Sequence, residues 1–136
     1  MKYLVLDASI AIGWMVDLPV PRRALRALHL IQSGTIGVVP DLWYYEVLNA
    51  LITAERRGRA SAQVVASHVS DLERLAAFLE LSPTTPFALI AAARQSGLAA
   101  YDAAYFELAL RRNLPLATLD DAMRTAAQRS GIELLR

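Results

Sequence analysis

The sequence contains no cysteine and only two histidines, His29 and His68. Without cysteine the chain has no disulfide, no thiolate metal ligand and no cysteine nucleophile. The absence of disulfides is compatible with a reducing cytoplasm, which is the compartment we expect. Both histidines fall inside ordinary helical patterns, so we interpret them as packing or surface residues. A Ser–His–Asp nucleophile arrangement is therefore not expected.

Long apolar runs and glycine-rich phosphate loops are also absent. The apolar run at 87–93 is far shorter than the roughly 20 residues that a membrane-spanning helix needs. The apolar segment near the start is interrupted by Asp7 and Ser9 and is followed by no small-residue cleavage site, so it does not fit a signal peptide. There is no P-loop and no G-x-G-x-x-G motif. We expect no membrane association and no nucleotide-binding fold of these kinds.

Lysine is nearly missing, because Lys2 is the one lysine among fourteen basic residues and the others are arginines. The net charge is only +1, so the chain has no strong overall field. Three groups of arginines stand close together in the sequence: Arg22, Arg23 and Arg26; Arg56, Arg57 and Arg59; and Arg111 with Arg112. Guanidinium groups suit phosphate oxygens, which makes the first two groups candidate phosphate contacts. Solvated helix ends would explain the same clusters equally well.

The 136 residues, of which 55% are hydrophobic, are enough for one globular domain with its own core, spanning 1–136. Short apolar runs predict strands, listed in chain order as 3–6, 35–39, 79–81, 115–119 and 132–135. Helical spacing and end signals predict helices at 9–16, 22–34, 42–58, 61–78, 86–95, 101–112 and 120–130, with Asp41 as an N-cap and Ser61 at the start of its helix. The expected fold class is α/β, with a mainly parallel central sheet of four or five short strands flanked by helices on both faces.

Two of these predicted strands end in the same way. Asp7 follows strand 3–6 and has Ser9 beside it, and Asp120 follows strand 115–119 and has Thr118 beside it. In parallel sheets, ligands bind beyond the carboxyl ends of the strands. The sequence therefore places both acids where a site is expected.

Two further acids interrupt apolar helical patterns. Glu46 is surrounded by large apolar residues and shares a helix face with Asn49 and Thr53, and Asp102 lies in a second apolar stretch. Any one of the four acids could simply cap a helix or face solvent. A buried carboxylate, however, costs several kcal/mol unless it is paired. A shared hard cation, Mg²⁺ or Mn²⁺, would compensate all four through oxygen ligands alone.

Four segments, taken in order, resemble the PIN-domain ribonucleases and, within that family, the VapC toxins of toxin–antitoxin pairs. They are LVLDASIAIGW (4–14), PDLWYYEVLNAL (40–51), LAAYDAAYFELAL (98–110) and LPLATLDDAMRTAA (114–127), and they extend over nearly the whole chain. The resemblance implies a PIN-like nuclease domain over 1–136. It also implies a four-acid catalytic and metal site with three supporting polar residues: Asp7, Glu46, Asp102 and Asp120, with Ser9, Asn49 and Thr118. Asp121 lies outside the motif and is interpreted as the first residue of a helix.

The function that this resemblance implies is that of a Mg²⁺-dependent endoribonuclease, with Mn²⁺ as the alternative ion, which hydrolyses RNA phosphodiester bonds. The first two arginine groups named above would hold flanking RNA phosphates, which offsets the repulsion between an acidic site and a polyanion. The resemblance further implies a homodimer and a cognate antitoxin protein. Trp14 and Met15 are candidates for lining the antitoxin groove, although both would fit a core position equally well.

Two other functions remain open at the level of sequence. One is a Mg²⁺-dependent phosphatase with Asp7 as the nucleophile; such enzymes usually carry a second aspartate two residues later, where this chain has Ser9. The other is a non-catalytic PIN-like module that binds RNA or protein and whose acids only cap helices.

Overall fold

The computed structural model describes all residues from Met1 to Arg136. Its sheet contains four strands: β1 (Tyr3–Leu6), β2 (Ile36–Val39), β3 (Leu79–Leu81) and β4 (Leu116–Ala117). The spatial order is β3-β2-β1-β4, and every pairing is parallel. The carboxyl ends of all four strands therefore meet at one edge of the sheet. This confirms the predicted α/β class and the predicted parallel sheet.

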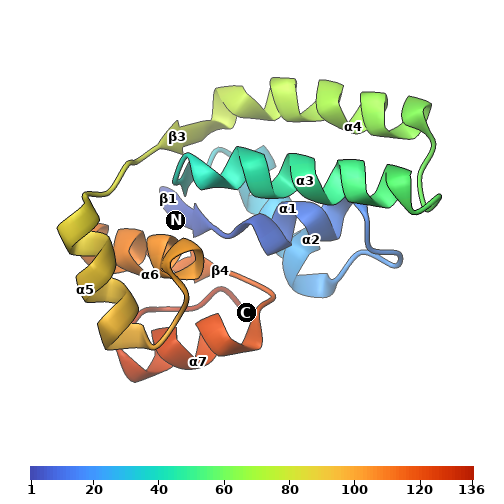
Figure 1. The fold of residues 1–136 in the computed structure, drawn as a ribbon. Coiled ribbons are helices and arrows are strands. Elements are labelled where there is room, and N and C mark those ends of the chain that lie inside the picture. The colour runs from blue at the N-terminus through green and yellow to red at the C-terminus, as the bar shows by residue number, and fades with distance from the viewer.

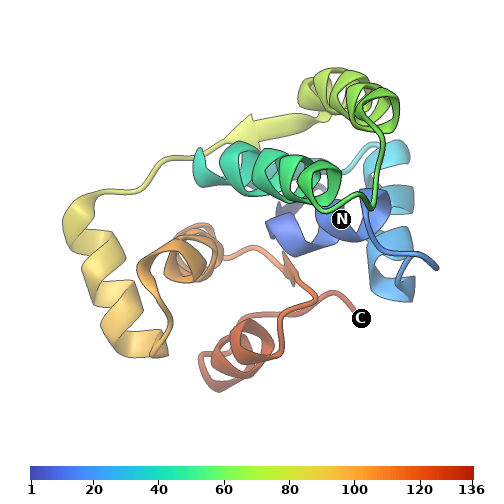
Figure 2. The ribbon, with the colours of Figure 1, turned by 45° about the vertical axis from the view of Figure 1, so that its right-hand side comes forward.

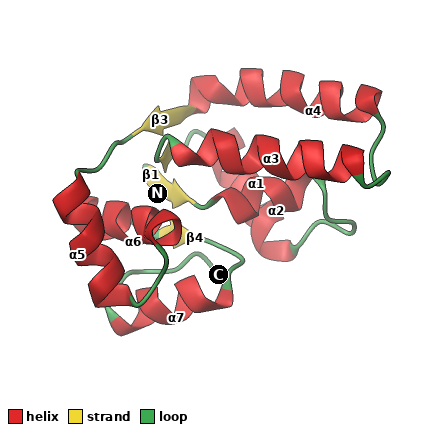
Figure 3. Cartoon of the chain, viewed as in Figure 1, coloured by secondary structure: helices red, strands yellow, loops and turns green.

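Helices cover the sheet on both sides. They are α1 (Ala8–Met15), α2 (Arg22–Gln32), α3 (Leu42–Arg56), α4 (Ala62–Leu75), the 3₁₀ turn η1 (Ala76–Phe78), α5 (Pro86–Ser96), α6 (Ala100–Arg112) and α7 (Asp121–Arg129). In both Figure 1 and Figure 2, α1–α4 gather on one side of the strands and α5–α7 on the other. Figure 3 shows how short the strands are beside the helices. None of the helices combines the length and apolar character needed to cross a bilayer.

The apolar character of β1 and α6 follows from their place in the core. Leu4, Val5 and Leu6 of β1 are fully buried, because neighbouring strands and helices enclose them. Helix α6 packs against β1 and β4 and is buried from Ala103 to Ala109. This packing fixes the start of α6, which carries Asp102, relative to the ends of β1 and β4.

A glycine in β2 makes room for a side chain of the edge strand. A Cβ atom built on Gly37 of β2 would lie 2.7 Å from Cδ2 of Leu79 in β3. Real Cβ atoms do not approach this closely, so a side chain at position 37 would require the Leu79 side chain to shift. The glycine therefore leaves room for Leu79 over β2.

Most of the predicted helix ends are confirmed, but one predicted cap is wrong. The Ser61 hydroxyl accepts the N–H of Val64 at 3.1 Å, as expected of an N-cap. Asp41 precedes α3, but its side chain accepts no capping hydrogen bond and its backbone is already helical. The carbonyl of Pro40 accepts the Trp43 N–H instead, at 3.0 Å. Near its end, the predicted helix 61–78 tightens into η1 after Leu75.

The predicted strand at 132–135 is wrong. Leu134 forms only an isolated bridge with Leu116, which donates to Glu133 and accepts from Leu135, both at 2.9 Å. The reason lies in β4, which covers 116–117 instead of the predicted 115–119. After Ala117 the chain no longer pairs with β1, and the amides of Leu119 and Asp120 donate to the hydroxyls of Ser9 and Thr118 instead. A two-residue strand offers its outer neighbour too few partners to extend the sheet.

Candidate functional site

Asp7 lies at the carboxyl end of β1, where two hydroxyl groups hold it. Only 4% of the residue is exposed, and its Oδ2 atom accepts hydrogen bonds from Ser9 Oγ at 2.6 Å and Thr118 Oγ1 at 2.7 Å. The two hydroxyls are themselves oriented by main-chain amides, because Ser9 Oγ accepts from Leu119 N at 2.9 Å and Thr118 Oγ1 from Asp120 N at 3.0 Å. The Oδ1 atom receives no protein hydrogen bond and is the oxygen left to bind a ligand.

The parallel pairing of β1 and β4 explains why these residues meet. The Asp7 N–H donates to the Ala117 carbonyl at 3.0 Å, so the residues that follow both strands emerge side by side. Ser9 stands in the first turn of α1 and reaches across to β4, 3.4 Å from the Thr118 hydroxyl. The structure thus brings together the two acid-and-hydroxyl pairs that the sequence places at strand ends.

Glu46 is half-buried on α3 and is held by a residue that the sequence analysis did not identify. Its Oε1 atom accepts a hydrogen bond of 2.6 Å from the hydroxyl of Tyr105, which is fully buried on α6. Burial raises the pKa of Tyr105, and the neighbouring Glu46 raises it further, so the phenol stays protonated and donates. The available sequence signal was spacing, because Tyr105 follows Asp102 by three positions and so shares its helix face.

The four acids influence one another electrostatically. Burial raises the pKa of Asp7; the two hydroxyls partly oppose this, and the charges of Asp102 and Asp120 raise it further. Burial likewise raises the pKa of Glu46, with Asp7 and Asp102 adding to the effect and Tyr105 opposing it. The pKa of Asp102 is raised by burial and then by Asp120. The fold therefore concentrates negative charge that it does not compensate.

The carboxylates are near one another but are not arranged as a finished metal centre. No group of three or more acidic or histidine side chains converges closely enough to hold an ion as it stands. Asp120 also has a structural role, because its Oδ1 atom accepts the Met123 N–H at 2.8 Å and caps α7. The donor set nevertheless fits a hard cation, since the site offers only carboxylate oxygens and raises the pKa of three acids. Asp7 and Asp102, with Asp120, are the residues that could hold such an ion.

The second arginine group adjoins Glu46 in part. A cavity of about 380 Å³ is lined by Glu46, Asn49 and Thr53 together with Arg57 and Arg59, whereas Arg56 takes no part in it. Asn49 thus lies one helical turn from Glu46 on the same wall, as expected from their spacing. The first arginine group, 22–26, lines a different cavity of about 660 Å³, beside Leu119. Basic side chains therefore line the cavity that contains Glu46 and a second cavity that includes Leu119, the residue before Asp120. We call Asp7, Glu46, Asp102 and Asp120 the acidic cluster.

Comparisons with known proteins support a shared fold over nearly the whole chain. The model of the family described as PIN domain matches residues 4–128. No curated protein matches the chain. Among solved structures, PAE2754 from Pyrobaculum aerophilum aligns with a TM-score of 0.72 at 24% identity, over 99% of this chain and 84% of that one.

Two other similar structures come from bacteria. One is VapC20 from Mycobacterium tuberculosis, described as a Sarcin-Ricin loop cleaving toxin, with a TM-score of 0.62 and 14% identity over 90% of this chain and 94% of that one. The other is VapBC2 from Rickettsia felis, bound to a DNA fragment from their promoter, with a TM-score of 0.63 and 16% identity over 98% and 97% of the two chains. At these identities the likeness concerns the fold.

Proposed function

Since the chain belongs to the PIN domain family, we propose that it is a divalent-metal-dependent endoribonuclease that hydrolyses RNA phosphodiester bonds. One observation carries the proposal: Asp7 is buried and oriented by two hydroxyls at the sheet edge, with uncompensated carboxylates around it. A stable fold gains nothing from such a concentration of charge, because buried carboxylates without a partner are costly. A bound cation would compensate the charge of these carboxylates, and it would in turn bind a phosphate group of the substrate.

The proposed roles follow from the position of each acid. Asp7 presents Oδ1, and together with Asp102 and Asp120 it would hold Mg²⁺ or Mn²⁺. When bound, such an ion neutralises phosphate charge and activates water. Glu46, held by Tyr105, orients the attacking water and accepts its proton as the new oxygen–phosphorus bond forms. The bond to the leaving oxygen breaks, and that oxygen takes a proton from solvent water. The raised pKa of Glu46 makes it a stronger base than an ordinary carboxylate.

The arginines beside Glu46 are proposed substrate contacts. Arg57 and Arg59 line the cavity that begins at Glu46, so an RNA strand lying over the acids would pass close to them. In this cavity the two guanidinium groups would bind phosphates next to the one that reacts, without taking part in the reaction. Arg56 does not line this cavity, so we expect it to contribute less.

The biological role that we propose is that of a toxin with a cognate antitoxin. VapC20, which shares the fold, is described as a toxin. VapBC2, which also shares the fold, is described as bound to a DNA fragment from their promoter. A cavity of about 350 Å³ lined by Trp14, Met15, Leu28 and Leu75 would accept an apolar antitoxin segment. Growth of cells that express the chain, with and without Asp7→Asn, is the measurement that tests the toxin role.

A homodimer is the proposed assembly. Large apolar side chains are exposed around β3 and α5, including Phe87 at 92%, Leu81 at 53% and Ile90 at 47%. Exposed apolar side chains gathered in one region commonly mark an interface. The molar mass of the purified chain, measured by sedimentation, decides between monomer and dimer.

RNA cleavage is the direct test of the proposed function. Incubation of total cellular RNA with the purified chain in Mg²⁺ should produce discrete new ends, and EDTA should remove them. Mapping those ends also identifies the substrate. Equal cleavage with and without EDTA would overturn the metal requirement.

The second candidate function is a non-catalytic module that binds RNA or protein. It is favoured by one observation, namely that no three acids form a ready metal site, while Asp120 already has a capping role. In that case the RNA would remain intact under every ion condition. Binding without new RNA ends would therefore select this candidate over the nuclease.

Tyr105→Phe is expected to slow cleavage by about tenfold, the loss of one hydrogen bond to a charged group. The variant keeps the packing of the ring and removes only the hydroxyl that holds Glu46 at 2.6 Å. Because that hydrogen bond lowers the pKa of Glu46 against the effect of burial, its loss raises this pKa further. The rising limb of the pH–rate profile should therefore move to higher pH.

Tyr101→Phe is the matched control, since Tyr101 lies on the same helix but is exposed. It should change neither the rate nor the pH profile. If Tyr105→Phe lowers the rate without moving the pH profile, the hydroxyl does not act through Glu46.

A further inference from the structure

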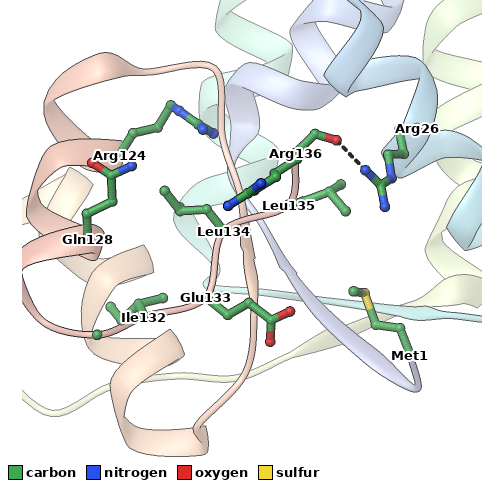
Figure 4. Close-up of a pocket in the computed structure, with 10 residues that line it drawn as sticks. Met1, Arg26, Arg124, Gln128, Ile132, Glu133, Leu134, Leu135 and Arg136 are labelled. Atoms are coloured by element: carbon green, nitrogen blue, oxygen red, sulfur yellow. Dashed lines mark hydrogen bonds between the residues drawn. The ribbon is translucent and has the colours of Figure 1, made fainter.

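A groove lined by arginines extends between α2 and α7. Two cavities of about 620 and 660 Å³ adjoin at Arg26 and Arg136, which line both of them. The Arg26 Nη1 atom donates a hydrogen bond of 2.8 Å to the Arg136 carbonyl and so links these two residues. The first cavity lies between α7 and the segment 131–136, where Figure 4 shows Arg124 reaching from the helix toward Arg136. The second cavity lies along the start of α2. We call the two adjoining cavities the arginine groove and define it by Arg22, Arg23, Arg26, Arg124 and Arg136.

The positive charge of the arginine groove is only partly compensated by the protein, since Asp121 is the one acid that raises the pKa of Arg124. The three salt bridges of the structure involve Arg74, Arg111 and Arg112, none of which lines the groove. Glu133 is the one acid on its walls. An anionic ligand is therefore the partner that this surface lacks.

Two guanidinium nitrogens in the groove are buried without an acceptor. They are Nε of Arg23 and Nη1 of Arg124, and no protein atom accepts a hydrogen bond from either. A buried donor left unpaired costs about 1–3 kcal/mol. Burial lowers the pKa of Arg124 and the charge of Arg23 lowers it further, while the charge of Asp121 raises it. An anion bound near both arginines would relieve their mutual repulsion.

The arginine groove begins beside the acidic cluster. Leu119 lines it and stands between Thr118 and Asp120 in the chain. The main-chain N–H of the same residue donates to Ser9 Oγ at 2.9 Å, within the hydrogen-bond network of Asp7. Leu119 thus lies between the acids and the groove, and a long ligand bound at the acids could extend past it into the groove.

We propose that the arginine groove binds the backbone phosphates of an RNA strand as it leaves the acidic cluster. This inference rests on the proposed function and adds a path for the strand, between α2 and α7, with Arg23 and Arg124 as its phosphate contacts. Two adjoining cavities lined by five arginines fit a strand with repeated phosphates better than one small anion. Guanidinium forks bind phosphate oxygens in pairs.

The test is RNA binding under conditions that prevent cleavage. A short, fluorescein-labelled single-stranded RNA of mixed sequence is titrated with the full chain in EDTA at several salt concentrations, and anisotropy gives the Kd. Arg124→Gln and Arg23→Gln should each raise the Kd by about tenfold. Each should also reduce the slope of log K against log salt by about 0.7, the value for one phosphate contact on a single strand.

Arg129→Gln is the matched control, because Arg129 lies on α7, is exposed and lines neither cavity. It should leave Kd and salt slope unchanged, and thermal melts of all variants establish that they fold. Arg124→Lys keeps the charge without the fork and should fall between the wild type and Arg124→Gln. If the wild type does not bind this RNA, or Arg124→Gln binds as tightly as Arg129→Gln, the proposal is wrong.

The same variants exclude a different occupant. Poly-glutamate used as a competitor would displace RNA only weakly from a phosphate site. If Arg124→Gln weakens poly-glutamate binding but not RNA binding, the groove receives an acidic protein segment, and the proposal is overturned. Because binding is measured in EDTA, it can succeed where RNA cleavage fails, so failure of the nuclease proposal and failure of this one are separate results.

Discussion

Asp7→Asn is expected to lower Mg²⁺-dependent RNA cleavage by about 1,000-fold, which corresponds to about 4 kcal/mol of transition-state stabilisation. Asparagine has nearly the same shape, and its carbonyl oxygen can still accept from the Ser9 and Thr118 hydroxyls that hold Asp7. What is lost is the negative charge on the oxygen that faces the site. Initial rates on an RNA identified by cleavage mapping, measured at saturating Mg²⁺, give the effect.

Asp121→Asn supplies the comparison, since Asp121 is exposed at the start of α7 and directly follows Asp120. It should cleave at the wild-type rate. A variant that loses activity because it is unfolded would show a lower melting temperature. For Asp7→Asn we expect a higher one. Without a divalent ion it should melt higher than the wild type, because it removes a buried charge that Asp102 and Asp120 repel. Wild-type cleavage by Asp7→Asn would contradict the role assigned to Asp7.

Mg²⁺ is expected to raise the melting temperature at neutral pH by roughly 10 °C. Binding at 100 times the Kd stabilises the folded state by about 2.7 kcal/mol, and each kcal/mol shifts the melting temperature of a chain of this size by about 4 °C. The cation would relieve the repulsion that raises the pKa of Asp7, Glu46 and Asp102. Thermal melts in Mg²⁺, in EDTA and in NaCl of equal ionic strength provide the measurement.

The pH dependence of the same melts has a definite sign. A carboxyl group whose pKa is higher in the folded state stabilises the fold below its unfolded pKa, near 4, and loses that contribution as pH rises through the folded value. In EDTA, stability from these three acids should therefore fall as pH rises above about 4. Mg²⁺ should reverse this trend, and Asp7→Asn should weaken it. A melt that Mg²⁺ shifts no more than NaCl does would exclude a metal at this site.

The sequence predicted the framework of the fold because its signals were local. Continuous apolar runs identified β1, β2 and β3 within a residue of their ends, and the family model confirms the resemblance to PIN domains over residues 4–128. Asp7 and Asp120 were placed at strand ends by the same reading. Alternating strands and helices predict parallel strands, and parallel strands bring both acids to the same edge of the sheet.

Other features depended on contacts between distant residues and could not be found from local pattern. The segment 132–135 has the composition of a strand, but β4 is too short to pair with it because the amides of Leu119 and Asp120 bind hydroxyls. The sequence around Tyr105 is typical of a core aromatic residue. Its contact with Glu46 arises only because the fold brings α3 against α6 at the Tyr105 hydroxyl. Arg124 of α7 and Arg26 of α2 likewise come to line one cavity only through the folding of the chain.

The hydrogen bonds around Asp7 join residues from opposite ends of the chain, since Thr118 lies 111 positions after it. A nascent polypeptide still being translated has β1 and its aspartate but not the hydroxyl and amides that orient the carboxylate. The ribosome must therefore release the chain as far as Thr118 and Asp120 before the Asp7 carboxylate can be oriented. If this protein degrades RNA, the order of synthesis alone delays its activity, because no shorter nascent chain contains the oriented acid.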